Sequence, residues 1–228
     1  MRGKNWPYPK VFQRQIMERA CWYAEPQCLQ LARDVLNGYL TGQRKTVIGS
    51  PLPDGKLLCA AILHGSAELW DMLWSKLFSA ATLEHAAFPL DTVLHGLSCT
   101  SDRHRLWKLL NETTVSSLLK DHRSFVMHNV AASKLSSEVM MEFLLSKWQE
   151  AGTNKTSSID TSVRDALFRM VSRNAKTTHE VSLLTAALAT SSNNRFLSEA
   201  FTLAVEQRKH YTSWHRDHDS ELVKAFAA

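Results

Sequence analysis

Long apolar runs are missing from this sequence. None of its stretches approaches the ~20 apolar residues that cross a bilayer, so we expect no membrane segment in this chain. The opening residues, MRGKNWPYPKVFQRQ, are charged and lack the apolar core of a signal peptide. Taken alone, these two absences favour a cytosolic protein.

Runs of basic residues are missing as well. The formal net charge is +5 and the isoelectric point is near 9.1, yet no run of Lys and Arg exceeds two. Such scattered charge is typical of a solvated surface, and we expect no nucleic-acid partner. The 44% hydrophobic and 21% charged residues are ordinary for a globular protein and exclude a disordered one.

Alternating β patterns are absent too, since the one short candidate, TVI at residues 46–48, is too brief to count. Apolar residues instead recur at helical spacings of three and four in residues 57–81, 136–151 and 162–174. Glycine and proline fall between these periodic segments. Helix starts are expected after Asp54, after Ser101 and Asp102, and after residues 191–194.

This spacing predicts ten to twelve helices of about 10–15 residues joined by short turns. Successive helices joined this way pack as antiparallel pairs, and a row of pairs makes an α-solenoid. We therefore predict an all-α fold, an irregular α-α superhelix of the HEAT-like or armadillo-like kind. No strict repeat is visible in the sequence, which argues against a regular array.

Signatures of a self-sufficient active site are also missing. The sequence has no G-x-S-x-G elbow, no P-loop and no paired acids for glycoside hydrolysis. HEVSL, beginning at His179, is one residue short of the H-E-x-x-H zinc signature, because Leu183 stands where the second His is needed. We interpret it as a helix start, with Glu180 in the first turn and Thr177 or Thr178 as cap, and the rival interpretation is a metal site.

Histidine is concentrated near the end of the chain, in HYTSWHRDH. A metal could bind there, but the irregular spacing and the Arg and Asp are typical of an exposed helix. The residues concerned are His210, His215, Asp217 and His218.

Seven tryptophans are many for this length, and we expect those in the helical runs to pack between helices. These are Trp70, Trp74, Trp107, Trp148 and Trp214.

The cysteines and two sequons point away from the cytosol. The four cysteines are an even number, although buried thiols remain the alternative. The sequons begin at Asn111 and Asn154, in polar stretches expected to be loops or helix ends. Sequons arise often by chance, so they add little weight toward an oxidising compartment.

An ordered set of short motifs resembles one known family. CAAILHGSAELWDMLW, residues 59–74, is followed by an AT turn and by L-S-C ending at Cys99. A-C-x6-C lies upstream, F-x4-W ending at Trp148 lies downstream, and the last motif is A-x-E…W…F in residues 204–226. The set resembles the C-terminal helical domain of zinc aminopeptidases related to aminopeptidase N and the endoplasmic reticulum aminopeptidases. It covers residues 12–228, leaving 1–11 as an N-terminal extension.

The resemblance implies two disulfides in an extracellular, plasma-membrane or secretory-pathway protein. The pairs are Cys21 with Cys28 and Cys59 with Cys99. In the chain-entropy model, the first bridge would raise the stability of the fold by about 2.5 kcal/mol and the second by about 4 kcal/mol. The same setting gives Asn111 and Asn154 a role as glycosylation sites.

The family's chemistry lies in another domain. Its HExxH…E zinc site and GxMEN motif are absent here, so the resemblance implies a chain without the catalytic domain and without a cofactor of its own. In the family this domain forms a helical bowl that closes over the active site, restricts the peptide substrates and can dimerise. The implied partners are the parent's zinc-containing catalytic domain, peptides and a second copy.

Some positions depart from the family pattern. Met141 replaces a common aromatic, Lys147 replaces a usual Asn, and Asn174 interrupts a usually basic-aromatic turn.

A peptide's terminal carboxylate would need a basic partner in such a bowl. Arg169 and Arg173, four apart on one expected helix, are our candidates, because Arg can grip a carboxylate through two hydrogen bonds. The alternative is that both are solvated surface residues. Two rival functions also remain: an intracellular helical-repeat scaffold that binds another protein on its concave face, and a metallo-hydrolase using His179 and Glu180.

Overall fold

The computed structural model describes residues 10–41, 53–79, 90–133, 136–153, 161–175, 177–190 and 195–226. All eleven long elements in these residues are α-helices, and no strand occurs among them. The prediction of an all-α protein is confirmed. Residues 46–48, the one short β candidate, lie outside the described ranges.

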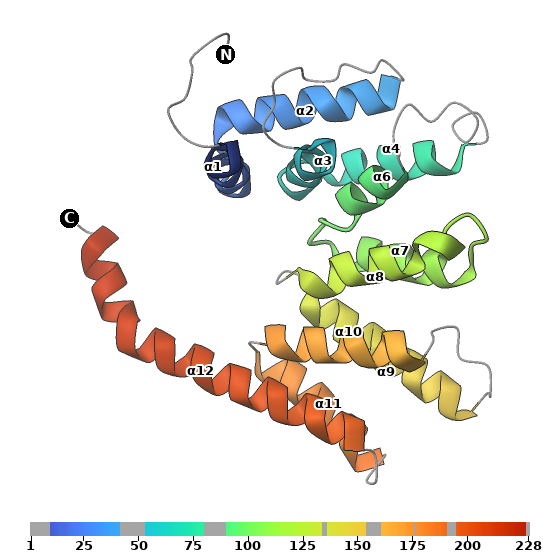
Figure 1. Ribbon diagram of the computed structural model, residues 1–228, viewed down its shortest axis with the longest axis vertical. Helices are drawn as coiled ribbons and strands as arrows, with labels where there is room; N and C mark the ends of the chain where they lie inside the picture. The colour runs from blue at the N-terminus through green and yellow to red at the C-terminus, as the bar shows by residue number, and fades with distance from the viewer. Residues whose placement is uncertain are drawn as a thin grey trace. The chain divides into compact units, whose positions relative to one another are not determined.

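The chain forms two compact units, Met1–Leu109 and Leu110–Ala228, with their boundary inside one helix. The helices of the first unit are α1 (Lys10–Trp22), α2 (Pro26–Thr41), α3 (Asp54–Leu63), α4 (Ala67–Phe78), α6 (Leu90–Leu97) and the first part of α7 (Arg103–Val115). Figure 1 shows α3 between its neighbours, and it contacts α1, α2, α4 and α6. It is the central helix of this unit, and its Leu57 and Leu58 are fully buried.

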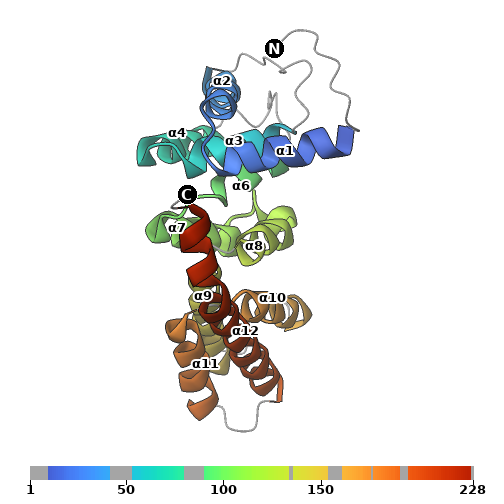
Figure 2. The same ribbon diagram turned by 90° about the vertical axis from the view of Figure 1, so that its left-hand side faces the viewer.

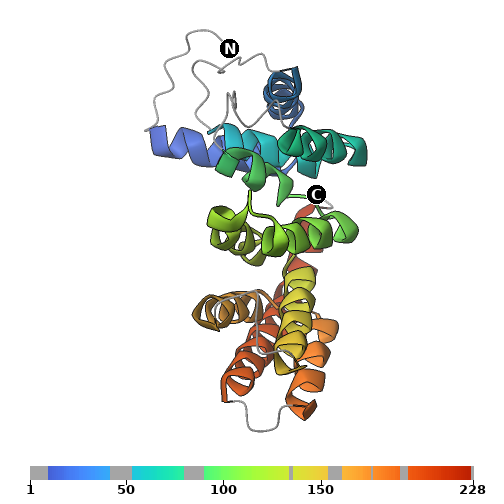
Figure 3. The same cartoon turned by 90° about the vertical axis from the view of Figure 1, so that its right-hand side faces the viewer.

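The second unit begins with the end of α7 and continues through a single 3-10 turn, η1 (Lys120–His122). Its helices are α8 (Arg123–Ala132), α9 (Ser137–Thr153), α10 (Thr161–Asn174), α11 (Thr178–Thr190) and α12 (Arg195–Phe226). α12 packs against both α10 and α11 (Figure 2). α9 and α11 lie side by side (Figure 3, yellow and orange). Phe143 and Phe168 lie in the core and are fully buried. Burial of each side chain stabilises the fold by roughly 1.5–3 kcal/mol.

Helix lengths differ from the prediction at one place. α12 has 32 residues, more than twice the expected length. The physical reason is visible in the sequence, because residues 195–226 contain neither Gly nor Pro to end the helix. Only its first part can be covered by α10 and α11, as Figure 1 shows.

Most consecutive helices contact one another within each unit, among them α2 with α3, α8 with α9 and α11 with α12, and α10 packs on α12 as well. Contact between successive helices is typical of an α-solenoid. The superhelical arrangement itself stays a prediction.

Candidate functional site

The HEVSL segment starts α11, as predicted. Thr177 is the cap: its Oγ1 accepts the Glu180 main-chain N–H at 3.2 Å, and its own N–H donates to Glu180 Oε2 at 2.9 Å. This reciprocal pair is a capping box, which satisfies two donors that a helix start leaves open. Leu183 lies one turn further along the same helix and supplies no ligand atom.

The Glu180 carboxylate is buried and already has partners. Its Oε1 accepts the Ser137 hydroxyl at 2.8 Å, and both residues are nearly inaccessible, with 2% and 4% exposed. A buried carboxylate needs such hydrogen bonds to remain stable. Glu180 therefore joins the first turn of α11 to the first residue of α9, which excludes it as the general base of a zinc hydrolase.

His179 points the other way, toward two glutamates of α9. Its Nε2 lies 3.4 Å from Glu142 Oε1 and 3.8 Å from Glu138 Oε1. His179 is about half exposed, whereas the Glu142 side chain is only 13% exposed. This cluster is not apparent from the sequence, because Glu138 and Glu142 are some forty positions away and only packing of α9 on α11 brings them close to His179.

Arg169 and Arg173 lie on α10, one turn apart and exposed. Arg169 Nη2 is 3.7 Å from Glu199 Oε2 of α12, and both side chains are about half exposed. An ion pair of this length in water contributes less than about 1 kcal/mol. It leaves the guanidinium able to exchange partners.

A basic groove runs between α11 and α12, with a volume of about 310 Å³. Its cations are Arg208, Lys209 and Arg216, and Val181 and Val205 form its apolar wall. Among the described residues no acidic side chain pairs with Arg208 or Lys209. This groove was not predicted from the sequence, although the four-residue spacing of Arg208, Thr212 and Arg216 places them on one helix face and was a usable signal.

The histidine-rich segment lies on α12, as an exposed helix should. His218 Nδ1 is 2.8 Å from the Trp214 carbonyl, and the two rings stack at 5.0 Å. Trp214 is 49% exposed. Its predicted role in packing between helices is therefore wrong, because the second half of α12 extends past the helices that cover its first half. The side chains of His215 and Asp217 lie outside the described set.

The other tryptophans agree better with the prediction. Trp70 and Trp74 are buried, and their rings stack at 5.0 Å. Lys108 lies over both rings, at 5.7 Å from the Trp70 centroid and 5.0 Å from that of Trp74. Trp107 is half-buried, and the Trp148 side chain is outside the described set.

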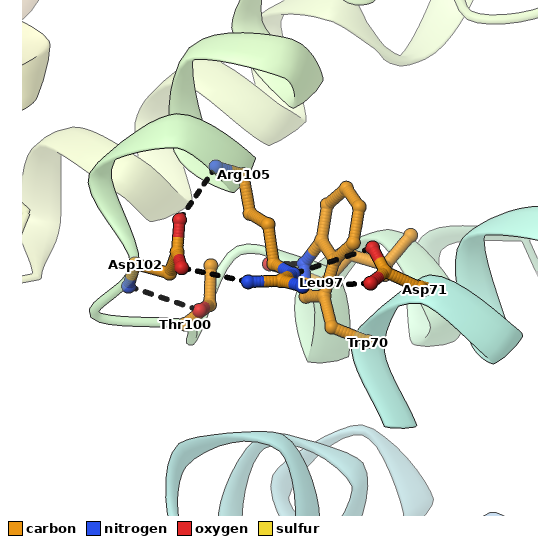
Figure 4. A network of polar contacts seen from close by, with 6 residues as sticks. All are labelled: Trp70, Asp71, Leu97, Thr100, Asp102 and Arg105. Carbon is orange, nitrogen blue, oxygen red and sulfur yellow. Dashed lines mark hydrogen bonds and ion pairs between the residues drawn. The ribbon is translucent and has the colours of Figure 1, made fainter. Parts of the chain in front are cut away.

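Trp70 belongs to a polar network that ties three elements together (Figure 4). Its indole Nε1 donates to the Leu97 carbonyl at 2.9 Å, at the end of α6. Arg105 of α7 reaches Asp71 of α4 at 2.6 Å and Asp102 at 2.7 Å. The Arg105 guanidinium thus bridges two carboxylates beside the Trp70 ring.

Folding favours the charged form of both carboxylates in the network. The hydrogen bond from Arg105 lowers the pKa of the Asp71 carboxyl, and its Coulomb attraction adds to the effect. The Arg105 main-chain N–H does the same for the pKa of Asp102, which caps α7 at 2.9 Å. This confirms the predicted helix start at Asp102.

Both disulfides implied by the family resemblance are present in the structure. Cys21 is linked to Cys28 across the turn between α1 and α2, and Cys59 of α3 is linked to Cys99 after α6. The Cα atoms are 5.2 Å apart in each pair, within the usual range. The second bridge joins the two helices that contact each other most extensively in the first unit.

The two sequons lie in different settings. Asn111 is exposed, in the last part of α7, but Thr113 of the same sequon is fully buried. Asn154 lies outside the described residues. Glycosylation stays a prediction.

Residues 9–209 match the family model described as "ERAP1-like C-terminal domain". This match extends through both compact units and covers most of the chain. The chain belongs to the ERAP1-like C-terminal domain family. The departures at Met141, Lys147 and Asn174 are compatible with membership: Met141 is fully buried, and Asn174 donates to the Ala131 carbonyl at 3.0 Å, joining α10 to α8.

Relatives of this ERAP1-like domain are aminopeptidases and a related ectoenzyme. The domain is 27% identical over 135 residues to aminopeptidase Q of Acinonyx jubatus, covering 59% of this chain and 13% of that protein. It is 22% identical over 213 residues to the thyrotropin-releasing hormone-degrading ectoenzyme of Mus musculus, covering 92% of the chain and 19% of the relative. It is 21% identical over 239 residues to aminopeptidase N of Canis lupus familiaris, covering 98% of this chain and 23% of that protein.

The chain therefore spans less than a quarter of the length of these relatives. In the part of the chain that the structure describes, no helix combines the length and apolar character needed to cross a membrane.

Proposed function

We propose that this ERAP1-like domain is the non-catalytic C-terminal domain of a zinc metallo-aminopeptidase. It covers the active-site chamber and determines which peptides enter. One observation carries the proposal: residues 9–209 match the C-terminal domain of a peptidase family, while HExxH and GxMEN occur nowhere in the 228 residues. The two motifs are the chemistry of that family, so hydrolysis falls to a separate catalytic domain, which holds the zinc.

The partners follow from this role. They are the parent's catalytic domain, peptide substrates and, in a dimeric parent, a second copy. Exposed apolar side chains on α1, Phe12, Ile16 and Trp22, offer a surface for a protein partner, since they line one depression with Glu18 and Arg19. Burial of such residues is the main driving force of domain association.

Peptide capture uses the arginines of α10. Arg169 and Arg173 are exposed and one turn apart, so both can approach one carboxylate. A planar guanidinium binds a carboxylate through two parallel hydrogen bonds, which a lysine cannot do. The weak contact with Glu199 holds Arg169 in place until a peptide carboxylate replaces it.

We place the protein outside the cell or in the secretory pathway. Two disulfides in one domain are typical of oxidising compartments. One relative is named an ectoenzyme. Glycans on Asn111 and Asn154 belong to the same proposal. Four free thiols and unmodified sequons would favour the rival, an intracellular helical-repeat scaffold.

The first test of this function is kinetic. Arg169→Ala/Arg173→Ala in the parent enzyme is expected to raise KM for long peptides and leave aminoacyl-amide hydrolysis unchanged, because only long peptides place a carboxylate in the bowl. Arg14→Ala/Arg33→Ala removes two exposed arginines from the first unit and is the matched control. Equal kinetics of the two double variants on long peptides would contradict the role of the arginines.

The second test concerns the isolated chain. Purified protein with equimolar Zn²⁺ is expected to leave aminoacyl-amide substrates intact, since Glu180 is held in its capping box. Hydrolysis that disappears in Glu180→Gln would instead support the metallo-hydrolase.

A further inference from the structure

The strongest chemistry outside the proposed chamber role lies where α11 begins beside α9. Three potential ligand atoms meet there, one each from Glu138, Glu142 and His179, and all lie within 4.8 Å of one another. Glu138 and Glu142 are one turn apart on α9, so both carboxylates are presented on the same helix face. His179 comes from the first turn of α11.

The separations are longer than those of a short charge-assisted hydrogen bond. A charge-assisted N–H···O bond is about 2.7–2.9 Å long, whereas His179 Nε2 is 3.4 Å from Glu142 and 3.8 Å from Glu138. Two ligand atoms on one tetrahedral zinc, at bond lengths of about 2.0–2.2 Å, are about 3.3–3.5 Å apart. The distance from Nε2 to Glu142 lies in this range, the distance from Nε2 to Glu138 exceeds it by a few tenths of an ångström, and all three ligand atoms lie within 4.8 Å of one another.

The main chains around the cluster are held in place. Ser137 precedes Glu138, Glu180 follows His179, and these two buried neighbours hydrogen-bond to each other at 2.8 Å. Thr177 fixes the same turn through the capping box. A ligand set on two helices that are already joined loses little entropy when a metal binds.

The ligand types also suit a cation. Glu138 and Glu142 can each supply a carboxylate oxygen, and His179 can supply an imidazole nitrogen. One imidazole and two carboxylates suit Zn²⁺, whereas Ca²⁺ takes six to eight oxygens.

We propose that Glu138, Glu142 and His179 form a surface zinc site that links α9 to α11, with water as the fourth ligand. The ion would replace the two long contacts of His179 by three coordinate bonds. Its effect is to fasten the start of α11 to α9 and so stabilise the second unit.

The test is a Zn²⁺ titration of the full chain by competition with a chromophoric chelator. We expect saturable binding of Zn²⁺ at this cluster and at least a 10-fold loss of affinity in His179→Ala and in Glu142→Gln. His128→Ala, an exposed histidine of α8 in the same unit, is the matched control and should bind like wild type. Circular dichroism of each apo variant checks that it folds.

The histidines of α12 are the internal rival. Replacing His210, His215 and His218 by Ala should leave the affinity unchanged. Hydrogen exchange supplies a second readout, since Zn²⁺ should slow exchange at the starts of α9 and α11 in wild type and not in His179→Ala. Zinc binding that survives His179→Ala, or that is lost with the α12 histidines, would overturn the proposal, as would no zinc binding at all.

Discussion

Gly96 of α6 offers a quantitative test of how closely α3 and α6 approach. A Cβ added at this position would lie 2.9 Å from Leu58 Cβ and 3.6 Å from Leu58 Cδ1. Carbon atoms are most stable about 3.5–4.0 Å apart, and the first of these atoms is held rigidly by the α3 main chain. Gly96→Ala therefore requires the helices to separate.

Two opposing effects set the magnitude. Ala is favoured over Gly inside a helix by up to about 1 kcal/mol, although Gly96 is next to the last residue of α6 and gains less. Inserting a methyl group into a filled core costs about 1–3 kcal/mol. The Cys59–Cys99 bridge prevents the helices from moving apart freely, since Cys59 follows Leu58 and Cys99 is three residues beyond Gly96. The cost of inserting the methyl group exceeds the gain in helix propensity, and we expect Gly96→Ala to lower the free energy of unfolding by about 1–2 kcal/mol.

The assay is urea unfolding followed by circular dichroism, with hydrogen exchange of α3 and α6 as a local readout. Gly55→Ala is the matched control. Its Cβ would lie 3.4 Å from His95 Cδ2, an ordinary contact with a side chain, so we expect it to be neutral or up to about 1 kcal/mol more stable.

A second background separates crowding from other causes. In a Cys59→Ala/Cys99→Ala protein the helices can adjust, so the penalty of Gly96→Ala should shrink. Wild-type stability for Gly96→Ala, or an equal penalty in both backgrounds, would refute the close approach of α3 and α6 or its coupling to the bridge.

Three further perturbations test the first unit. Trp70→Phe leaves a buried main-chain carbonyl without its donor and should cost about 2–3 kcal/mol in urea unfolding; a cost below 0.5 kcal/mol, about the spread of neutral substitutions, would show that the hydrogen bond is unimportant. Asp71→Asn breaks the ion pair with Arg105. Because folding lowers the pKa of Asp71, the stabilisation by this pair is present above about pH 4 and is lost as the pH falls through the pKa of the folded protein. The variant should therefore lose under about 1 kcal/mol of stability at pH 7 and show a flatter decline of stability in acid, and an unchanged decline would contradict this. Cys59→Ala/Cys99→Ala opens a 40-residue loop and should lower the free energy of unfolding by up to about 4 kcal/mol. An unchanged urea midpoint would show that the bridge does not stabilise the fold.

The helices were predictable because local rules decide them. The cap at Asp102 and the start at Thr177 follow from side chains one to three residues from the helix, and the structure uses both. The length of α12 could also have been anticipated, since no Gly or Pro interrupts it. Periodicity alone suggested shorter elements because it shows where apolar residues recur and not where a helix ends.

Packing between distant segments was beyond the sequence. Periodicity placed Trp70 and Trp214 alike in helical runs, yet one is buried at 1% exposed and the other is half-exposed. Which turn of a helix is covered depends on its neighbours in space. The cluster around His179 is the same case, because HEVSL is a local motif whereas its acidic neighbours come from α9.

The family resemblance supplied what periodicity could not. Four cysteines allow three pairings, and only the resemblance singled out Cys21 with Cys28 and Cys59 with Cys99, which the structure contains. It gives no comparable help with Arg169 and Arg173, whose role depends on which helix faces line a chamber.

Association in trans tests the central claim most directly. The parent's catalytic region, expressed without this domain, is mixed with the purified chain, and kcat/KM is measured over peptides of increasing length. The account predicts a 1:1 complex in which the chain, inactive alone, restores the length dependence of the intact enzyme. A catalytic region that neither binds the chain nor changes its peptide profile would contradict it.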